Sequence, residues 1–179
     1  MAFLTVLALV AFGAFPPQPV ALQQSAGTSL EYQVKAAYIL NFVSLTEWPA
    51  AALGPALSPF RICVSGADAF RGVLANTVRG GSVQGHPLVV ERFSHMTAQT
   101  CQVLFVPAAD AGQTAAMLRN LGSAPVLTVG EAEAFLGGGG VVRFVIDQGH
   151  VRFDVNRRSA EEHGLTLSSR LLKVARNVQ

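Results

Sequence analysis

The amino-acid sequence predicts a single α/β domain, with a mixed, mostly parallel sheet, a C-terminal antiparallel hairpin and flanking helices. A long apolar pattern at helical spacing opens the chain and ends at Trp48-Pro49. Short apolar strand patterns then alternate with helical ones over residues 60–129. Two further strand patterns flank the turn 147–150, in which Gly149 supplies the unusual backbone angles. Alternation of this kind is typical of α/β architecture.

The length and composition of the chain limit the classes of protein it can belong to. Its 179 residues suit one domain with a real core. Because 50% of the residues are hydrophobic and 13% are charged, the chain is globular and not disordered. The formal net charge of +2 comes with scattered arginines and no basic stripe. We therefore expect no nucleic-acid partner.

The N-terminal segment has no charged residue before Glu31. Residues 2–15 form an apolar run of signal-peptide length, shorter than the roughly 20 residues of a membrane-spanning helix. The positive residues that normally precede such a run are missing. We predict a signal peptide over residues 1–26 and a folded domain over residues 27–179, so we expect the protein to be secreted across the inner membrane. An uncleaved anchor and a buried N-terminal helix are the alternatives.

The first helix has predictable ends. Thr28 and Glu31 have the spacing of a capping box, which predicts the helix start. Pro49 cannot continue a helix and disfavours the α conformation at Trp48, so the helix should end at or before Glu47.

The elements after this helix follow from periodicity. Residues 60–65 alternate with period two, which places Phe60, Ile62 and Val64 on one face and Cys63 on the other. The apolar run 103–106 is typical of a central strand covered on both faces. The remaining expected elements are a helix over 68–78, a strand over 88–93, a helix over 113–121 with Ala116, Met117 and Leu121 inward, a strand over 126–129 and a short helix over 131–136.

The C-terminal part is expected to contain a hairpin and two short helices. The hairpin strands are residues 141–146 and 151–155, and the second is an edge strand with Arg152 and Asp154 on its outer face. Asn156 is a favourable cap for the first helix. Ser168 should cap the terminal helix, whose packing stripe is expected to contain Leu171, Leu172, Ala175 and Val178.

Cys63 and Cys101 are the two cysteines of the chain. In an oxidising compartment two cysteines usually pair. If the strand 103–106 lies beside the strand 60–65, the two sulfurs meet without rearrangement, and the bond ties the sheet near its edge. The alternative is two unpaired, small apolar side chains in a cytoplasmic core.

Motifs for catalysis are absent from the sequence, which contains no G-x-S-x-G and no H-E-x-x-H. His86, His95, His150 and His163 are scattered, so we expect isolated surface histidines and no metal site. The glycine run 137–140 is not followed by Lys-Ser/Thr and leads into a strand, which indicates a flexible turn and not a phosphate loop. We expect no enzyme activity and no cofactor. A hydrolase is the enzymatic alternative to test.

Both ends of the chain carry motifs of a known family. The opening motif consists of Lys35, two alanines, Tyr38, Asn41-Phe42 and Glu47-Trp48-Pro49. The closing motif consists of Phe153, Asn156, Ala160, Gly164-Leu165, Ser168-Ser169 and Leu171-Leu172. Over residues 31–178 the chain resembles the YfiR-like (YfiR/HmsC-type) family of periplasmic regulators.

The resemblance implies a regulatory protein without catalytic activity. Such a protein would bind the periplasmic part of an inner-membrane diguanylate cyclase and hold it inactive, which lowers cyclic-di-GMP and biofilm formation. A homodimer is a further expectation from the family. The alternative is a ligand-sensing module that passes a small-molecule signal to a membrane histidine kinase. That function requires a concave pocket near the carboxyl ends of the parallel strands.

Contacts with a partner or ligand are predicted at four side chains. Tyr38 and Trp48 belong to the first helix and its exit, where the large amphipathic aromatics of the chain are concentrated. Such rings favour interfaces and ligand clefts. Arg61 and Arg152 are candidate contacts for anions or carboxylates on the sheet, as is Arg143. The alternatives are core packing for Trp48 and solvated positions for the arginines.

Overall fold

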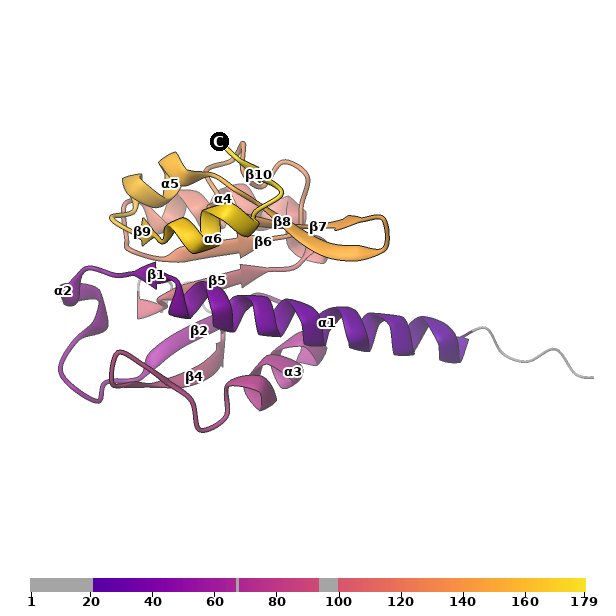
Figure 1. Ribbon diagram of the computed structural model, residues 1–179, viewed down its shortest axis with the longest axis horizontal. Coiled ribbons are helices and arrows are strands. Elements are labelled where there is room, and N and C mark those ends of the chain that lie inside the picture. Colours follow the sequence, from indigo (N-terminus) through magenta and orange to yellow (C-terminus); the bar gives the residue numbers. More distant parts are fainter. Residues whose placement is uncertain (1–20, 67, 94–99) are drawn as a thin grey trace, which may run out of the picture.

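The computed structural model describes residues 21–66, 68–93 and 100–179, and Figure 1 shows their arrangement. Residues 1–20, most of the predicted signal peptide, lie outside these ranges, as does His95. Within the described ranges one sheet has eight strands in the order β10-β8-β7-β6-β5-β2-β4-β3. The strands are β2 (Phe60–Val64), β3 (Ser82–Val83), β4 (His86–Arg92), β5 (Val103–Val106), β6 (Leu127–Gly130), β7 (Val142–Asp147), β8 (His150–Val155) and β10 (Asn177–Val178). A separate antiparallel pair joins β1 (Thr46–Glu47) to β9 (Thr166–Leu167).

The sheet is mixed and mostly parallel, as the sequence predicts. Strands β4, β2, β5, β6 and β7 run parallel to one another. β8 returns antiparallel to β7 through a turn in which Gln148 and Gly149 both have positive φ, the conformation of a two-residue hairpin. The chain reaches β4 and β5 on opposite sides of β2, so the direction of strand order reverses at β2. There the Ser65 hydroxyl donates a 2.5 Å hydrogen bond to Asp110.

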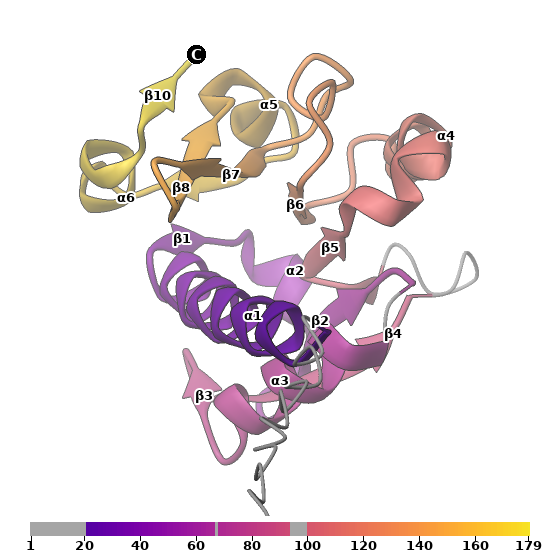
Figure 2. The same ribbon diagram turned by 90° about the vertical axis from the view of Figure 1, so that its right-hand side faces the viewer.

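Helices cover both faces of the sheet (Figures 1 and 2). α1 (Ala21–Ser44) and α3 (Asp68–Val78) lie on one face, and α4 (Ala111–Leu121) lies on the other. The alternation predicted for β2 is confirmed, because Ile62 and Val64 pack into the core beneath α1 whereas Cys63 packs into the core beneath α4. β5 is buried along its whole length and contributes side chains to both cores, as expected for a central strand.

α1 begins earlier than the sequence predicts. It already includes Ala21, the first described residue, so Thr28 lies within the helix and the capping-box expectation is wrong. The residues before Thr28 include Ala, Leu and Gln, which propagate a helix readily. Its end at Ser44, before Pro49, agrees with the prediction. The first turns project beyond the body of the molecule (Figure 1). Among the described residues, no helix combines the length and the apolar character needed to cross a membrane.

Two expectations about helices are wrong. Residues 131–136 form a turn and not a helix, because the ring of Phe135 packs between Gly130 and Gly140, where a Cβ would lie 2.2 Å from it. In α4 the side chains of Thr114, Met117, Leu118 and Leu121 are buried, whereas Ala116 is exposed. These four positions share one helix face at the i, i+3, i+4, i+7 spacing, and Ala116 falls outside it.

The C-terminal segment also differs from its prediction. α5 (Arg157–Glu162) and α6 (Ser169–Val174) begin at the expected caps, since Asn156 accepts from Ser159 N and Ser168 accepts from Leu171 N. Ala175 has an extended backbone and ends α6. The chain then continues as β10 along β8, so Val178 is a strand residue and β8 is not an edge strand.

Cys63 and Cys101 form the predicted disulfide, with their Cα atoms 5.9 Å apart. Cys63 lies in β2, and Cys101 precedes the neighbouring strand β5 by two residues. Both side chains are buried. The bond therefore joins two interior strands, and its expected position near the sheet edge is wrong.

Replacing both cysteines, Cys63→Ala with Cys101→Ala, should lower the free energy of unfolding by up to about 4 kcal/mol. The physical reason is that the bond restricts the unfolded chain between positions separated by 38 residues. Urea denaturation in oxidising buffer measures the difference. A reducing agent should shift the midpoint of the wild type and leave that of the double variant unchanged. A difference below about 1 kcal/mol would show that the crosslink contributes little.

Candidate functional site

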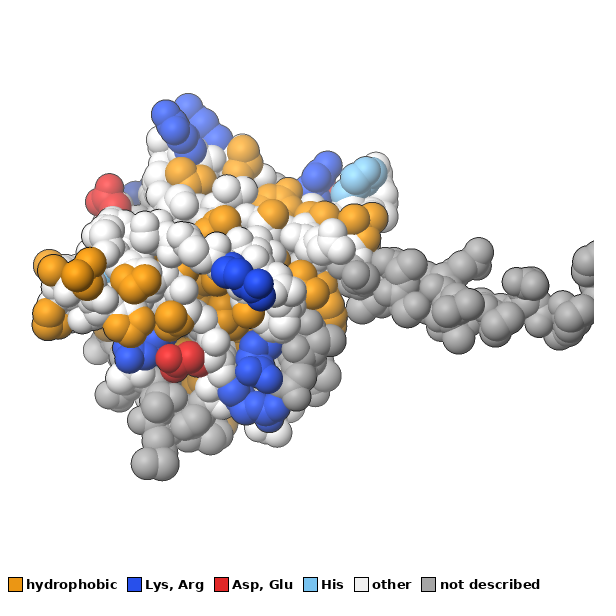
Figure 3. All heavy atoms as spheres, turned by 90° about the horizontal axis from the view of Figure 1, so that it is seen from below, with side chains coloured by type: hydrophobic (Ala, Val, Ile, Leu, Met, Phe, Trp, Pro, Cys, Tyr) orange, Lys and Arg blue, Asp and Glu red, His pale blue; other side chains and the backbone are white. Residues whose placement is uncertain are grey.

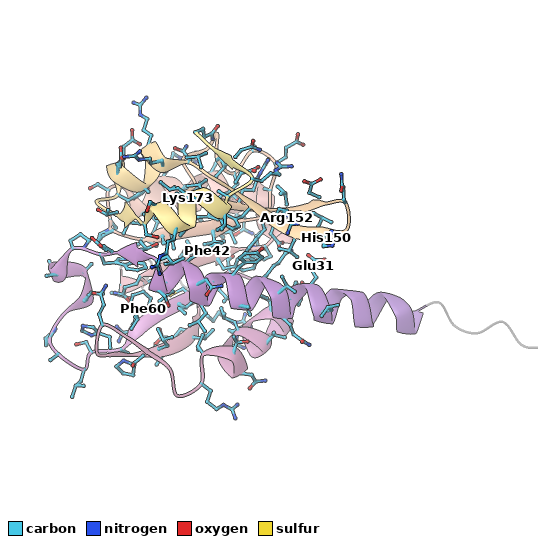
Figure 4. The ribbon with its side chains drawn as sticks, viewed as in Figure 1. Glu31, Phe42, Phe60, His150, Arg152 and Lys173 are labelled. Atoms are coloured by element: carbon cyan, nitrogen blue, oxygen red, sulfur yellow. A yellow bond between two sulfur atoms is a disulfide. The ribbon has the colours of Figure 1, made fainter. Side chains whose placement is uncertain are left out.

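A charged cleft opens where β5 and β6 reach their carboxyl ends. The chain leaves β6 directly into Glu131, while β7 continues past this point into its hairpin. α1 supplies the opposite wall. The cleft has a volume of about 500 Å³ and is defined by the six charged side chains of Glu31, Lys35, Glu131, Glu133, Arg143 and Arg176. In Figure 4, Glu31 of α1 and His150 and Arg152 of the hairpin lie at this end of the molecule.

Lys35 is buried at the floor of the cleft, with 4% of its surface exposed. Its Nζ donates to Glu31 one turn earlier and to Glu131 Oε1 at 2.5 Å. The second oxygen of Glu131 accepts a 2.8 Å hydrogen bond from the backbone N of Ala108, which follows β5. This arrangement fixes α1 to the segments that follow two neighbouring strands.

The electrostatics of Lys35 favour its charged form. Burial alone opposes that form, but the hydrogen bonds to Glu131 and Glu31 outweigh it and raise the pKa of Lys35. The Nζ atom also lies 5.9 Å from the centroid of the Phe144 ring. Lys35 is therefore a fixed positive charge in the cleft and not a proton donor near neutral pH.

Asp154 joins three strands beside the cleft. It lies opposite Arg143 in the β7–β8 pair and opposite Asn177 in the β8–β10 pair. Arg176 donates to both carboxylate oxygens at 2.9 and 2.7 Å, and Arg143 donates to one at 2.7 Å. The hydrogen bonds from Arg176 outweigh burial and, with those from Arg143 and Asn177, lower the pKa of Asp154 to about 2. The carboxylate is therefore ionised throughout the physiological range.

The arrangement suits recognition of charged groups. Lysine, arginine and glutamate side chains line one open cleft beside Phe144, so it can bind a polar molecule or the charged side chains of another protein. Within the described part of the chain, no three His, Cys, Asp or Glu side chains cluster closely enough to hold a metal ion.

Tyr38 and Trp48, two predicted contact residues, both pack on the core. The Tyr38 ring is half-buried, and its centroid lies 5.4 Å from that of Phe153. Trp48 is 7% exposed and packs edge-on against Phe60 at 4.9 Å, while its Nε1 donates to the Gln102 carbonyl at 3.3 Å. The packing alternative accounts for the position of Trp48. A role of either ring in partner contact stays a prediction.

Arg61 and Arg152 lie apart from each other. Arg61 is on β2, where its Nε is 3.4 Å from Glu91 Oε1, and it lines a second cavity of about 440 Å³ with Gln102. Hydrophobic side chains gather at the neighbouring end of the molecule, formed by α2 (Ala50–Leu53) and the segment after it (Figure 3). Arg152 is exposed on the hairpin at the other end (Figure 4). Their roles as ligand contacts stay predictions.

Sequence reasoning named Arg143 as a candidate carboxylate contact but missed the other charged residues of the cleft, although two signals were available. Lys35 is a basic residue one position from Ala36 in an apolar helical stripe, which indicates a buried and therefore paired charge. Glu131 follows a short buried strand, at the edge of the sheet where functional side chains gather. No sequence signal indicated the role of Asp154, because the residues of its neighbouring strand β10 were expected to belong to the terminal helix.

The fold and the cleft define a single-domain α/β protein with a site for recognition. The chain matches the model of the YfiR/HmsC-like family over residues 32–176, and it belongs to this family. The family consists of regulatory periplasmic proteins that act in cyclic-di-GMP signalling. No curated protein matches the chain.

Several solved structures are similar to the chain, and two of them show how far the likeness extends. One is a conserved domain protein from Vibrio cholerae, with a TM-score of 0.52, 15% identity and coverage of 66% of this chain and 54% of that one. The other is an ABC domain from Streptococcus pneumoniae in complex with L-Trp, with a TM-score of 0.48, 15% identity and coverage of 67% and 55%. The chain spans about half the length of these proteins. The first likeness concerns the fold alone, and the second is too weak to support an argument.

Replacing Lys35 with methionine should lower the free energy of unfolding by about 3 kcal/mol, because the partly buried carboxylate of Glu131 loses its cation. The double variant with Glu131→Gln should recover part of this loss, and a double-mutant cycle from urea denaturation measures the coupling. Arg158→Ala, which breaks the exposed pair with Glu162, is the control and should change little. A Lys35→Met variant as stable as this control would contradict the role assigned to the buried charge.

Asp154 should make stability depend on pH in the acid range. Its pKa is about 2 in the folded protein and 3.8 ordinarily, so its contribution is present above pH 4 and is lost as pH falls towards 2. The shift corresponds to about 2 kcal/mol. Unfolding free energies of the wild type and Asp154→Asn should differ most at neutral pH and converge near pH 2. Equal pH dependence in the two proteins would show that another group is responsible.

Proposed function

We propose that the protein binds the periplasmic part of an inner-membrane diguanylate cyclase and holds that enzyme inactive. Release of the enzyme then raises cyclic-di-GMP and favours biofilm formation. The observation that supports this proposal is the family match over residues 32–176, which runs from α1 to the residue before β10. The family's general role is regulation in cyclic-di-GMP signalling. Repression of a diguanylate cyclase is the part of the proposal that goes beyond that role.

The surface around the charged cleft is the first place to test for this contact. Leu30, Val34 and Ile146 are three of the six large apolar side chains exposed among the described residues. Glu31, next to Leu30, lines the same cleft as Ile146. Exposed apolar side chains around a polar groove are typical of protein interfaces. We name Leu30, Val34, Ile146 and Arg152 the helix–hairpin surface.

Ile146→Asp should weaken binding to the membrane partner at least tenfold, because it places a charge at the apolar part of the helix–hairpin surface. The matched control is Val174→Asp, which alters an exposed valine of α6. Each exported protein serves as bait for detergent-solubilised membranes, and cellular cyclic-di-GMP is measured in parallel. The wild type and the control should retrieve a diguanylate cyclase and lower cyclic-di-GMP, whereas Ile146→Asp should do neither.

Two results of this experiment would contradict the proposal. If the wild-type bait retrieves no membrane signalling protein, repression of a cyclase is the wrong function. If Ile146→Asp and Val174→Asp bind equally well, the cyclase contacts another surface, and the Trp48 and Arg61 end of the molecule becomes the next to test.

A second function is favoured by the position of the charged cleft. Ligand sensing requires a concave pocket near the carboxyl ends of parallel strands, and the cleft of about 500 Å³ lies beside those of β5 and β6. In this function the protein binds a small polar molecule and signals to a membrane histidine kinase. Retrieval of a kinase in place of a cyclase would support it.

A further inference from the structure

A separate apolar cavity lies between α4 and the turn over residues 131–140. Its volume is about 550 Å³, larger than that of the charged cleft. α4 contributes Thr114, Ala115 and Leu118 to its walls, and the turn contributes Ala132, Phe135 and the two glycines at 137 and 138. The volume is within the range of about 300–1,000 Å³ that is usual for small-molecule sites.

The glycines of the turn fall into two groups. Gly130 and Gly140 are required by packing, because a Cβ at either would lie 2.2 Å from the Phe135 ring. Gly139 has a φ of +96°, which L side chains rarely adopt. Gly137 and Gly138 have neither constraint, since a Cβ at these positions meets only ordinary contacts of 3.4 Å or more. Neither packing nor backbone conformation therefore explains the lack of a side chain at these two positions.

The two unconstrained glycines are the ones that line the cavity. A Cβ at Gly138 would lie 3.7 Å from Leu118 Cδ1, on the opposite wall. A longer side chain at this position would therefore extend into the cavity and fill it. Glycine at 137 and 138 keeps the space between α4 and the turn open.

Glu133 supplies the charge of this cavity. It is the charged residue among the lining side chains, and its carboxylate forms no hydrogen bond or ion pair with any described residue. Its backbone carbonyl accepts a 2.8 Å hydrogen bond from Arg143, which holds the residue in place. The cavity thus combines apolar walls with one unpaired negative charge at its rim.

We propose that this cavity binds a small amphipathic molecule with an apolar chain or ring and a cationic head group. The apolar part contacts Ala115, Leu118 and Phe135, and the head group lies against the Glu133 carboxylate. The apolar walls account for most of the affinity, because burial of each CH₂ group is favourable. The exposed carboxylate adds selectivity for a cation over a neutral or anionic head group.

Octylamine, octanol and octanoate test the proposal, since they share one tail and differ in head group. Isothermal titration calorimetry with the wild-type protein should rank the amine first, about two- to fivefold ahead of the alcohol, with octanoate last. Glu133→Gln should bring the amine and the alcohol to equal affinity. Octanoate binding as tightly as octylamine would overturn the assignment of the head group.

Filling the cavity tests its location. Ala115→Leu should weaken octylamine binding at least tenfold, because the added side chain occupies the space of the tail. Ala116→Leu is the matched control, since Ala116 is the next exposed alanine of α4 and does not line the cavity. Gly138→Leu fills the cavity from the turn and should have the same effect as Ala115→Leu. Undetectable binding to the wild type, or equal binding by the Ala115 and Ala116 variants, would overturn the proposal.

Discussion

The packing of α1 against the C-terminal hairpin is the interaction on which the rest of the structure depends. The Phe42 ring lies 4.8 Å from that of Phe153 and 5.7 Å from that of Phe144, measured between centroids. Figure 4 shows Phe42 between α1 and the sheet. Aromatic contacts of this kind bury large apolar areas and have preferred geometries, so they fix the direction in which α1 crosses the sheet. Because Phe144 also lines the charged cleft, one cluster positions both of its walls.

Two buried charged side chains complete this framework, because their ion pairs set the positions of the elements they connect. Lys35 connects α1 to the segment after β6, and Asp154 connects β7, β8 and β10. The cost of removing such charges from water offsets much of their mutual attraction, so the net contribution of each pair is modest, at about 2 kcal/mol for the Asp154 carboxylate. Displacement of one partner, however, leaves the other buried and unpaired. We infer that the aromatic cluster stabilises the packing of α1 on the sheet. The ion pairs restrict α1 and the C-terminal strands to one arrangement.

The accuracy of the sequence predictions follows the range of the interactions involved. The alternation along β2, the hairpin turn at Gly149 and the cap at Asn156 depend on neighbours within a few residues, and they were predicted correctly. The pairing of Cys63 with Cys101 was predicted because two cysteines in an oxidising compartment usually pair, and the neighbouring positions of β2 and β5 allow it. The start of α1 was missed because a favourable capping pair at Thr28 does not stop a helix whose preceding residues also propagate it.

The convergence of these charges into one cleft could not be predicted, because the residues come from elements that are distant in the sequence. Glu31 and Lys35 are on α1, Glu131 and Glu133 follow β6, and Arg176 precedes β10. Their convergence depends on the crossing of α1 over the sheet and on the extension of β10 along β8. Ala175 ends α6 in an extended conformation, and the helical pattern of the flanking residues hid this change. The individual charged residues are therefore visible in the local sequence, whereas their convergence in one cleft is not.

The turn over residues 131–140 gives the charged cleft and the apolar cavity a physical connection. Glu133 lines both, and its carbonyl accepts from Arg143, which also binds Asp154. Shared residues alone do not couple two sites, because a ligand shifts an equilibrium only if it binds two arrangements with different affinity. Gly139 and the unfilled positions 137 and 138 give this turn few side-chain contacts. Movement of the turn would alter the hydrogen bond to Arg143, and this bond is therefore the point at which occupation of the cavity can influence the cleft.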